Sequence, residues 1–88
     1  MRGFKHLRSI NRNYSEQGLI FFTCQTYGKQ PEWMRRKIDK LCESAGGEYA
    51  PALKEFLTTD ADWVYICGKH HISDRTLYRI RKAFYENW

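Results

Sequence analysis

The chain has 88 residues, of which 16% are aromatic, and a net charge of +5 at pH 7. Its length, below the roughly 100–200 residues of a typical domain, predicts one domain, 1–88, with no room for a separate catalytic domain. The aromatic content predicts a folded core rather than a disordered tail. The basic balance favours a polyanionic partner, of which nucleic acid is the commonest.

The cysteines and the apolar runs bear on compartment and cofactors. Cys24, Cys42 and Cys67 form no CxxC pair, which favours buried, reduced thiols over a zinc ribbon or a redox site. Cys67 and His70 have the spacing of half a zinc site, but no second close pair completes four ligands. The apolar run 19–22 is too short to span a membrane, and no signal peptide is evident. We therefore expect a cytoplasmic protein without metal, cofactor or membrane contact.

Residues 1–14 form a basic segment without an acidic residue. Its apolar residues Phe4, Leu7 and Ile10 recur at a spacing of three, which permits a short helix. The segment is equally compatible with an N-terminal basic arm. Its positive charges are Arg2, Lys5, Arg8 and Arg12.

Residues 15–57 are predicted to form helices that support the C-terminal part of the chain. Ser15 is placed to cap a helix that ends near Gly28, although the short apolar run 19–23 also permits a strand. Pro31 is placed to open a second helix.

The second helix is predicted to end at Gly46-Gly47, since glycine commonly terminates helices. A third helix is predicted over 48–57, with Pro51 tolerated in its first turn. The second helix carries a basic cluster that could clamp a nucleic-acid backbone, although Glu32 and Asp39 weaken its field. The cluster consists of Arg35, Arg36, Lys37 and Lys40.

Residues 59–88 predict two further helices joined by a tight turn. Thr59 and Asp62 resemble a capping box, with aspartate in place of the usual glutamate. The helix that follows is expected to stop near His70-His71, and Ser73 is placed to cap the last helix. The chain is therefore predicted to be all-α, with four or five short helices and a C-terminal pair packed on a small helical bundle.

The stretch 62–88 resembles the helix-turn-helix consensus. Ile66 and Cys67 stand at its Ile-Ala positions, Ile72-Ser73 matches the residues that leave the turn, and 76–79 (TLYR) matches the start of the recognition helix. His70 and His71 depart from the usual Leu and Gly. Histidine tolerates a positive φ better than most residues, so the turn remains possible.

The last helix predicts a surface for duplex DNA. Leu77, Ile80, Phe84 and Trp88 recur every three or four residues and form one apolar stripe, so basic side chains lie opposite. Arginine can bond guanine bidentately, and the start of a recognition helix normally meets base edges. The predicted base-reading residues are Asp74, Arg75, Thr76, Tyr78 and Arg79. The predicted phosphate contacts are Lys69, Ser73, Arg81, Lys82, Arg2, Lys5 and Arg8.

The short chain and the form HISDRTLYRIRKAFYENW are similar to small regulators of Gram-positive phages and mobile elements, which resemble region 4 of sigma factors. This resemblance implies promoter or operator DNA as partner, with RNA polymerase or a second copy as a further partner. Tyr85 and Trp88 are expected to be exposed aromatic residues available for such a contact, although Trp88 also falls where a last core residue would lie.

Other functions remain open from the sequence. The same scaffold could serve as a protein-interaction module or as an inhibitor of a host protein, with Trp33, Tyr49 or the N-terminal half as its interface. RNA binding is weaker, because most aromatic residues fall at core-like positions. No paired carboxylates, GxSxG, HExxH or P-loop occurs, so we expect no catalytic residues and no enzyme.

Overall fold

The computed structural model describes residue 4 and residues 6–88, so the predicted phosphate contacts Arg2 and Lys5 lie outside the described residues. The predicted all-α fold is confirmed: the described residues form helices joined by short connections, with no strand among them. The helices are α1 (Tyr14–Gln25), α2 (Glu32–Gly46), α3 (Ala50–Thr58), α4 (Trp63–His70) and α5 (Asp74–Glu86), with 3-10 turns at Tyr27–Lys29 and Gly47–Tyr49.

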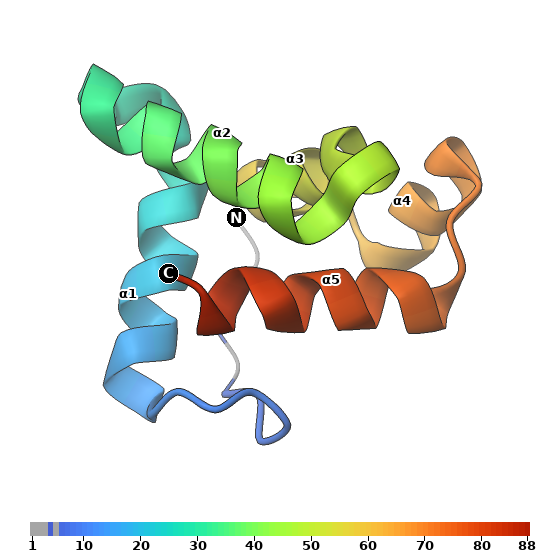
Figure 1. Cartoon of the computed structure of the whole chain (residues 1–88), viewed down its shortest axis with the longest axis horizontal. Helices are drawn as coiled ribbons and strands as arrows, with labels where there is room; N and C mark the ends of the chain where they lie inside the picture. The colour runs from blue at the N-terminus through green and yellow to red at the C-terminus, as the bar shows by residue number, and fades with distance from the viewer. Residues whose placement is uncertain (1–3, 5) are drawn as a thin grey trace.

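The other helices pack along one side of α5 and near its two ends. α5 (red) runs beneath α2 and α3 in Figure 1, with α4 near its N-terminal end and α1 near its C-terminal end. α2 packs against both α3 and α5, and α4 packs against α3. One core joins these elements, and its largest fully buried apolar side chains are Phe84, Ile20, Ile38, Leu53, Ile66, Leu77 and Ile80.

The N-cap residues of α1 and α4 differ from the predicted ones. The N-cap of α1 is Asn13 rather than Ser15, because only Asn13 has a glutamate three residues later. Its side chain accepts from the backbone N–H of Glu16 at 2.8 Å, and the Glu16 carboxylate accepts from the Asn13 N–H at 3.2 Å. This reciprocal capping box begins a helix through 19–23, where a strand was the alternative.

The N-cap of α4 is Asp62 rather than Thr59. Asp62 accepts from the backbone N–H of Tyr65 at 2.7 Å. Thr59 instead ends α3, since its hydroxyl donates to the carbonyl of Glu55 at 2.6 Å. Because Thr59 caps the end of α3, it does not cap α4, and α4 begins at Trp63.

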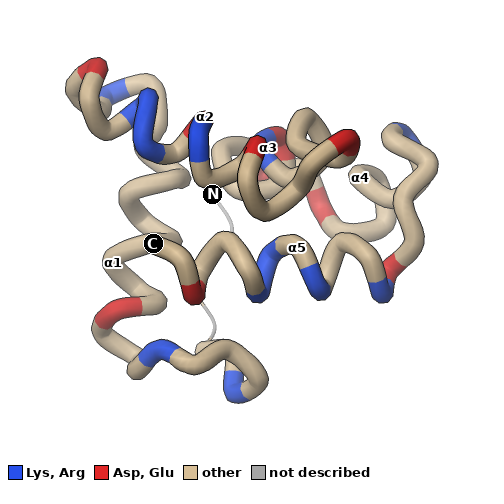
Figure 2. Tube along the Cα trace, in the orientation of Figure 1, with Lys and Arg blue, Asp and Glu red and all other residues tan. Residues whose placement is uncertain are grey.

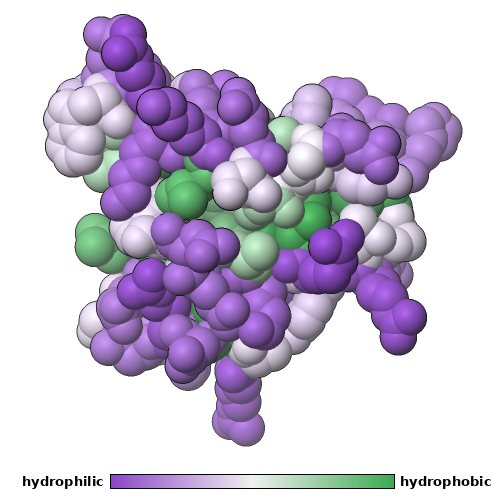
Figure 3. Space-filling model, viewed as in Figure 1, coloured by the Kyte–Doolittle hydropathy of each residue, from purple (hydrophilic) through white to green (hydrophobic). Residues whose placement is uncertain are grey.

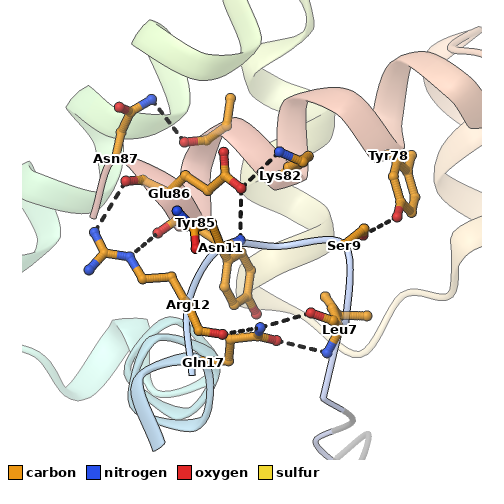
Figure 4. Close-up of polar contacts among 11 residues, drawn as sticks. Leu7, Ser9, Asn11, Arg12, Gln17, Tyr78, Lys82, Tyr85, Glu86 and Asn87 are labelled. Atoms are coloured by element: carbon orange, nitrogen blue, oxygen red, sulfur yellow. Dashed lines mark hydrogen bonds and ion pairs between the residues drawn. The ribbon is translucent and has the colours of Figure 1, made fainter. Parts of the chain in front are cut away.

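The N-terminal segment is held in place by a buried glutamine. Gln17 is fully buried, and its amide group donates to the carbonyls of Leu7 at 2.9 Å and Arg12 at 2.8 Å while accepting from the Leu7 N–H at 2.8 Å. Residues 8–12 form turns and bends rather than a helix, and Ile10 is buried in the core. Figure 4 shows this loop folded against the end of α5.

Arg12 joins the same segment to the C-terminal end of α5. Its Nε donates to the carbonyl of Tyr85 at 3.1 Å and its guanidinium donates to that of Glu86 at 3.2 Å. The N–H of Asn11 donates to the Glu86 carboxylate at 2.8 Å. A cation is favourable there, because the last carbonyls of a helix lack partners and carry partial negative charge.

This docking corrects the expected exposure of Tyr85, whose exposed fraction is only 3%. Its ring points into the loop formed by the N-terminal segment, so it cannot meet a partner (Figure 4). Trp88 is half-buried, 5.9 Å from Phe84 between ring centroids.

The cysteines differ in burial. Cys24 and Cys42 are buried as predicted, whereas Cys67 is half-buried. Burial raises the pKa of the Cys42 thiol to about 12.

Replacing the buried glutamine tests the docking of the N-terminal segment. Gln17→Leu removes three hydrogen bonds and leaves the half-buried Leu7 N–H and Arg12 carbonyl without the partner that the glutamine supplies, which costs on the order of 1–3 kcal/mol. We expect a lower urea midpoint and faster hydrogen exchange at the Leu7 amide. Ser15→Ala, on the exposed face of the same helix, should change neither measurement. Unchanged exchange in Gln17→Leu would contradict the role of the glutamine.

Candidate nucleic-acid interface

The turn between α4 and α5 lies at the residues where the sequence motif predicts one. His71 ends α4 in the left-handed region, with φ 53° and ψ 45°, where the consensus has glycine. Ile72 is buried, and its N–H donates to the carbonyl of Cys67 at 3.1 Å. Ser73 caps α5 by accepting from the N–H of Thr76 at 3.2 Å. The turn thus directs α5 away from α4 at the predicted residue.

Asp74 fixes the first turn of α5 to α4. Its Oδ1 accepts from the indole N–H of Trp63 at 2.9 Å and lies 3.4 Å from the Cys67 thiol. A carboxylate in the first turn also complements the positive end of the helix dipole. The residue predicted to read bases therefore has a positioning contact, which holds the two helices in register.

The outward face of α5 carries exposed cations. Leu77, Ile80 and Phe84 are buried, so Arg75 and Arg79 face solvent one turn apart. Neither arginine makes a hydrogen bond or ion pair with any residue that the structure describes. Figure 2 shows the basic positions of α5 on the side away from α2 and α3.

Tyr78 lies beside these arginines and contacts the N-terminal segment. Its hydroxyl donates to the Ser9 hydroxyl, and its ring remains exposed (Figure 4). Arg8, the neighbour of Ser9, is exposed. The structure therefore brings Ser9 and its neighbour Arg8 close to the outward face of α5. This contact joins residues 69 positions apart, and no local sequence pattern signals it.

Other predicted site residues have internal partners. Thr76 is half-buried and accepts from the Ser73 hydroxyl at 2.9 Å. Lys82 forms an ion pair with Glu86 at 2.8 Å. The guanidinium carbon of Arg81, which is half-buried, lies 4.8 Å from the centre of the Trp63 ring, so this side chain packs more than it projects.

Lys69 belongs to a charged cluster that joins α4 to α3. Its Nζ lies 3.0 Å from Oε1 of Glu55, and Nε2 of His70 lies 2.8 Å from the same oxygen. Hydrogen bonds with His70 and Lys69 hold the pKa of the Glu55 carboxyl below its ordinary value. The cluster links α4 to α3. It also gives Lys69, which was predicted to contact phosphate, an internal ion-pair partner.

The described residues hold neither a metal-binding cluster nor a membrane span. No group of three histidine, cysteine or acidic side chains among them could hold a metal ion. Cys67 and His70, the half zinc site of the sequence, contact Asp74 and Glu55 respectively. In this part of the chain, no helix combines the length and the apolar character needed to cross a membrane.

Comparison with known proteins adds no relative: no protein-family model, curated protein or solved structure matches the chain.

The Glu55 cluster predicts a pH-dependent contribution to stability. A carboxyl whose folded pKa is lowered stabilises the fold above its unfolded pKa, and this contribution disappears as the pH falls through the folded pKa. Glu55→Gln should therefore be less stable than wild type at pH 7. The difference should shrink below about pH 4.5, the ordinary pKa of glutamate.

Chemical denaturation of both proteins between pH 3 and 7 measures this difference. The control is Glu43→Gln, which removes an equal charge from an exposed glutamate on α2 whose side chain forms no hydrogen bond or ion pair with a described residue. A difference for Glu55→Gln that is independent of pH, or equal to that of the control, would contradict the linkage.

Proposed function

We propose that the chain is a small transcriptional regulator that binds double-stranded DNA sequence-specifically through the outward face of α5. The observation that carries this proposal is the pair Arg75 and Arg79, exposed on the first two turns of α5 without a described ionic partner. Arginine can donate bidentately to O6 and N7 of guanine in the major groove. The first turns of a second helix are the part of a helix-turn-helix that meets base edges.

The surroundings of this pair suit a phosphate backbone. Arg8 is exposed next to the Ser9–Tyr78 contact, and Ser73 lies at the N-terminal end of α5, where helix N–H groups favour anions. Lys82 lies farther along the helix and is paired with Glu86. Surface ion pairs contribute only about 0–1 kcal/mol, so Lys82 can exchange this partner for a phosphate at little cost.

The N-terminal segment contributes to the same proposal. Because Gln17 and Arg12 hold residues 7–12 against the helices, Arg8 is carried in a fixed position relative to α5. Arg2 and Lys5, which lie outside the described residues, are proposed as further phosphate contacts.

A single helix-turn-helix covers few base pairs, so useful specificity needs a second copy or another DNA-bound protein. The similarity of 62–88 to phage and mobile-element regulators supports RNA polymerase or a second copy in this role.

A second candidate function is that of a protein-interaction module, which could inhibit a host protein. The observation that favours it is the exposure of apolar side chains outside α5, since Val64 and Leu19 are 79% and 64% exposed. Under this function, substitutions on α5 would matter less than substitutions on α1 or α4.

Binding of a fluorescent duplex pool, followed by anisotropy at low and moderate salt, tests the DNA proposal. We expect the wild type to bind with a steep salt dependence, because cations release counterions from DNA. Arg75→Ala/Arg79→Ala should weaken binding roughly 30-fold or more, since each bidentate contact contributes about 1–3 kcal/mol.

Lys37→Ala/Lys40→Ala is the matched control, because it removes two cations from α2 and leaves the same net charge. It should retain most of the binding. Failure of the wild type to bind any duplex at low salt, or equal losses in the two double variants, would contradict the proposal.

A further inference from the structure

A groove lies between α2 and the C-terminal end of α5. It has a volume of about 640 Å³, within the range of about 300–1,000 Å³ that is common for ligand sites. Apolar surface between α2 and α5 is bordered by hydrophilic side chains in the space-filling view (Figure 3). The residues that give the groove its character are Trp33, Arg36, Lys37, Lys40, Leu41 and Trp88.

Two tryptophans give this groove apolar walls. Trp33 is 65% exposed, although large aromatic side chains are usually covered in a small folded domain. Trp88 packs on Phe84 on one side, and Nζ of Lys37 lies 4.3 Å from the centre of its ring. This cation–π contact holds the Lys37 ammonium at the groove instead of leaving it free in solvent.

The groove has an excess of positive charge. Among the described residues that line it, Glu32 is the only one with an acidic side chain, and it is paired with Arg36 at 2.8 Å. Neither Lys37 nor Lys40 has an ion-pair partner among residues 6–88. Asp39, between them in the sequence, is occupied by Lys54 at 2.9 Å and by the Tyr27 hydroxyl. An occupant that complements this surface must therefore be anionic and must also offer an apolar group to Trp33 and Leu41.

The position of the groove separates it from the DNA-binding face. α2 and α5 pack against one another through their buried sides, so their outward faces point away from each other (Figure 2). A duplex on Arg75 and Arg79 leaves the α2 face uncovered. A single strand is disfavoured because such sites stack successive bases, whereas Lys37 covers the Trp88 ring and leaves Trp33 as the groove tryptophan with an open face.

From these contacts we infer that the groove binds an acidic segment of a partner protein, with carboxylates at Lys37 and Lys40 and an apolar side chain against Trp33. Carboxylates can pair with Lys37 without displacing it from Trp88. The partner would then occupy the side of the molecule opposite the outward face of α5, so one chain could hold DNA and a protein together. The inference stands on α2 and does not require that α5 binds DNA.

A synthetic peptide tests the inference on the full chain. The probe is a fluorescein-labelled peptide of alternating aspartate and glutamate with a central leucine and phenylalanine. The same peptide with asparagine and glutamine in place of the acids is the control. Binding is followed by anisotropy, and the indole N–H resonances of the three tryptophans locate it.

We expect the acidic peptide to bind and the neutral peptide to bind at least about tenfold more weakly, with the indole signals of Trp33 and Trp88 shifting more than that of Trp63. Lys37→Ala/Lys40→Ala and Trp33→Ala should each weaken binding by roughly five- to tenfold. Arg75→Ala/Arg79→Ala, which removes the same charge from the other face, should change it by less than about twofold. Circular dichroism confirms that each variant is folded, and Trp33→Ala is the safer variant because its side chain is exposed.

Three outcomes would overturn the inference. The indole signals could remain unchanged up to millimolar peptide, or both double variants could lose peptide binding equally, which would indicate attraction to net charge alone. In the third outcome, Lys37→Ala/Lys40→Ala would weaken duplex binding as much as Arg75→Ala/Arg79→Ala does, which would assign the groove to nucleic acid. Equal losses of duplex binding in the two double variants would contradict both proposals. The DNA proposal alone fails if the peptide binds as expected but the wild type does not bind duplex or the α5 variant binds it as well. The inference alone fails if duplex binding is lost only in the α5 variant and the peptide does not bind at the groove.

Discussion

Burial of the apolar stripe of α5 is the constraint on which the rest of the structure depends. Leu77, Ile80 and Phe84 are almost completely buried, and burying each such side chain contributes about 1.5–3 kcal/mol. Because successive helix residues are rotated by about 100°, burying this stripe forces Arg75 and Arg79 to face solvent. The same packing requires α2 and α3 to cover the inner side. The fold and the cationic face therefore follow from one hydrophobic pattern.

The two ends of α5 are fixed by polar contacts that leave its outward face uncovered. Asp74 binds Trp63 of α4 at the N-terminal end, and Arg12 binds the last carbonyls at the C-terminal end. A helix held at both ends loses little conformational freedom when it binds a partner, which favours affinity. The contact of Ser9 with Tyr78 adds a third attachment near the middle. Ser9 and Tyr78 thus place the N-terminal segment beside the outward face of α5.

Local patterns predict much of this structure and contacts distant in sequence account for the rest. The spacing of apolar residues predicts the helices, and Ile72-Ser73 locates the turn and the cap of α5. The exposure of Tyr85 was predicted wrongly because its cover comes from a segment more than 70 residues earlier. The roles of Gln17 and Glu55 could not be predicted for the same reason, since a buried amide or an inter-helix ion cluster leaves no periodic signal in the sequence.

A titration of the full, isotope-labelled chain with a short DNA duplex at low salt, followed by backbone amide resonances, would show whether α5 is the helix that contacts DNA. We expect the largest shifts at Ser73 to Lys82 and at Arg8 and Ser9, while the amides of α2 change little. Absence of shifts, or shifts confined to α1, α2 or α4, would contradict the assignment of α5 as the DNA-binding helix.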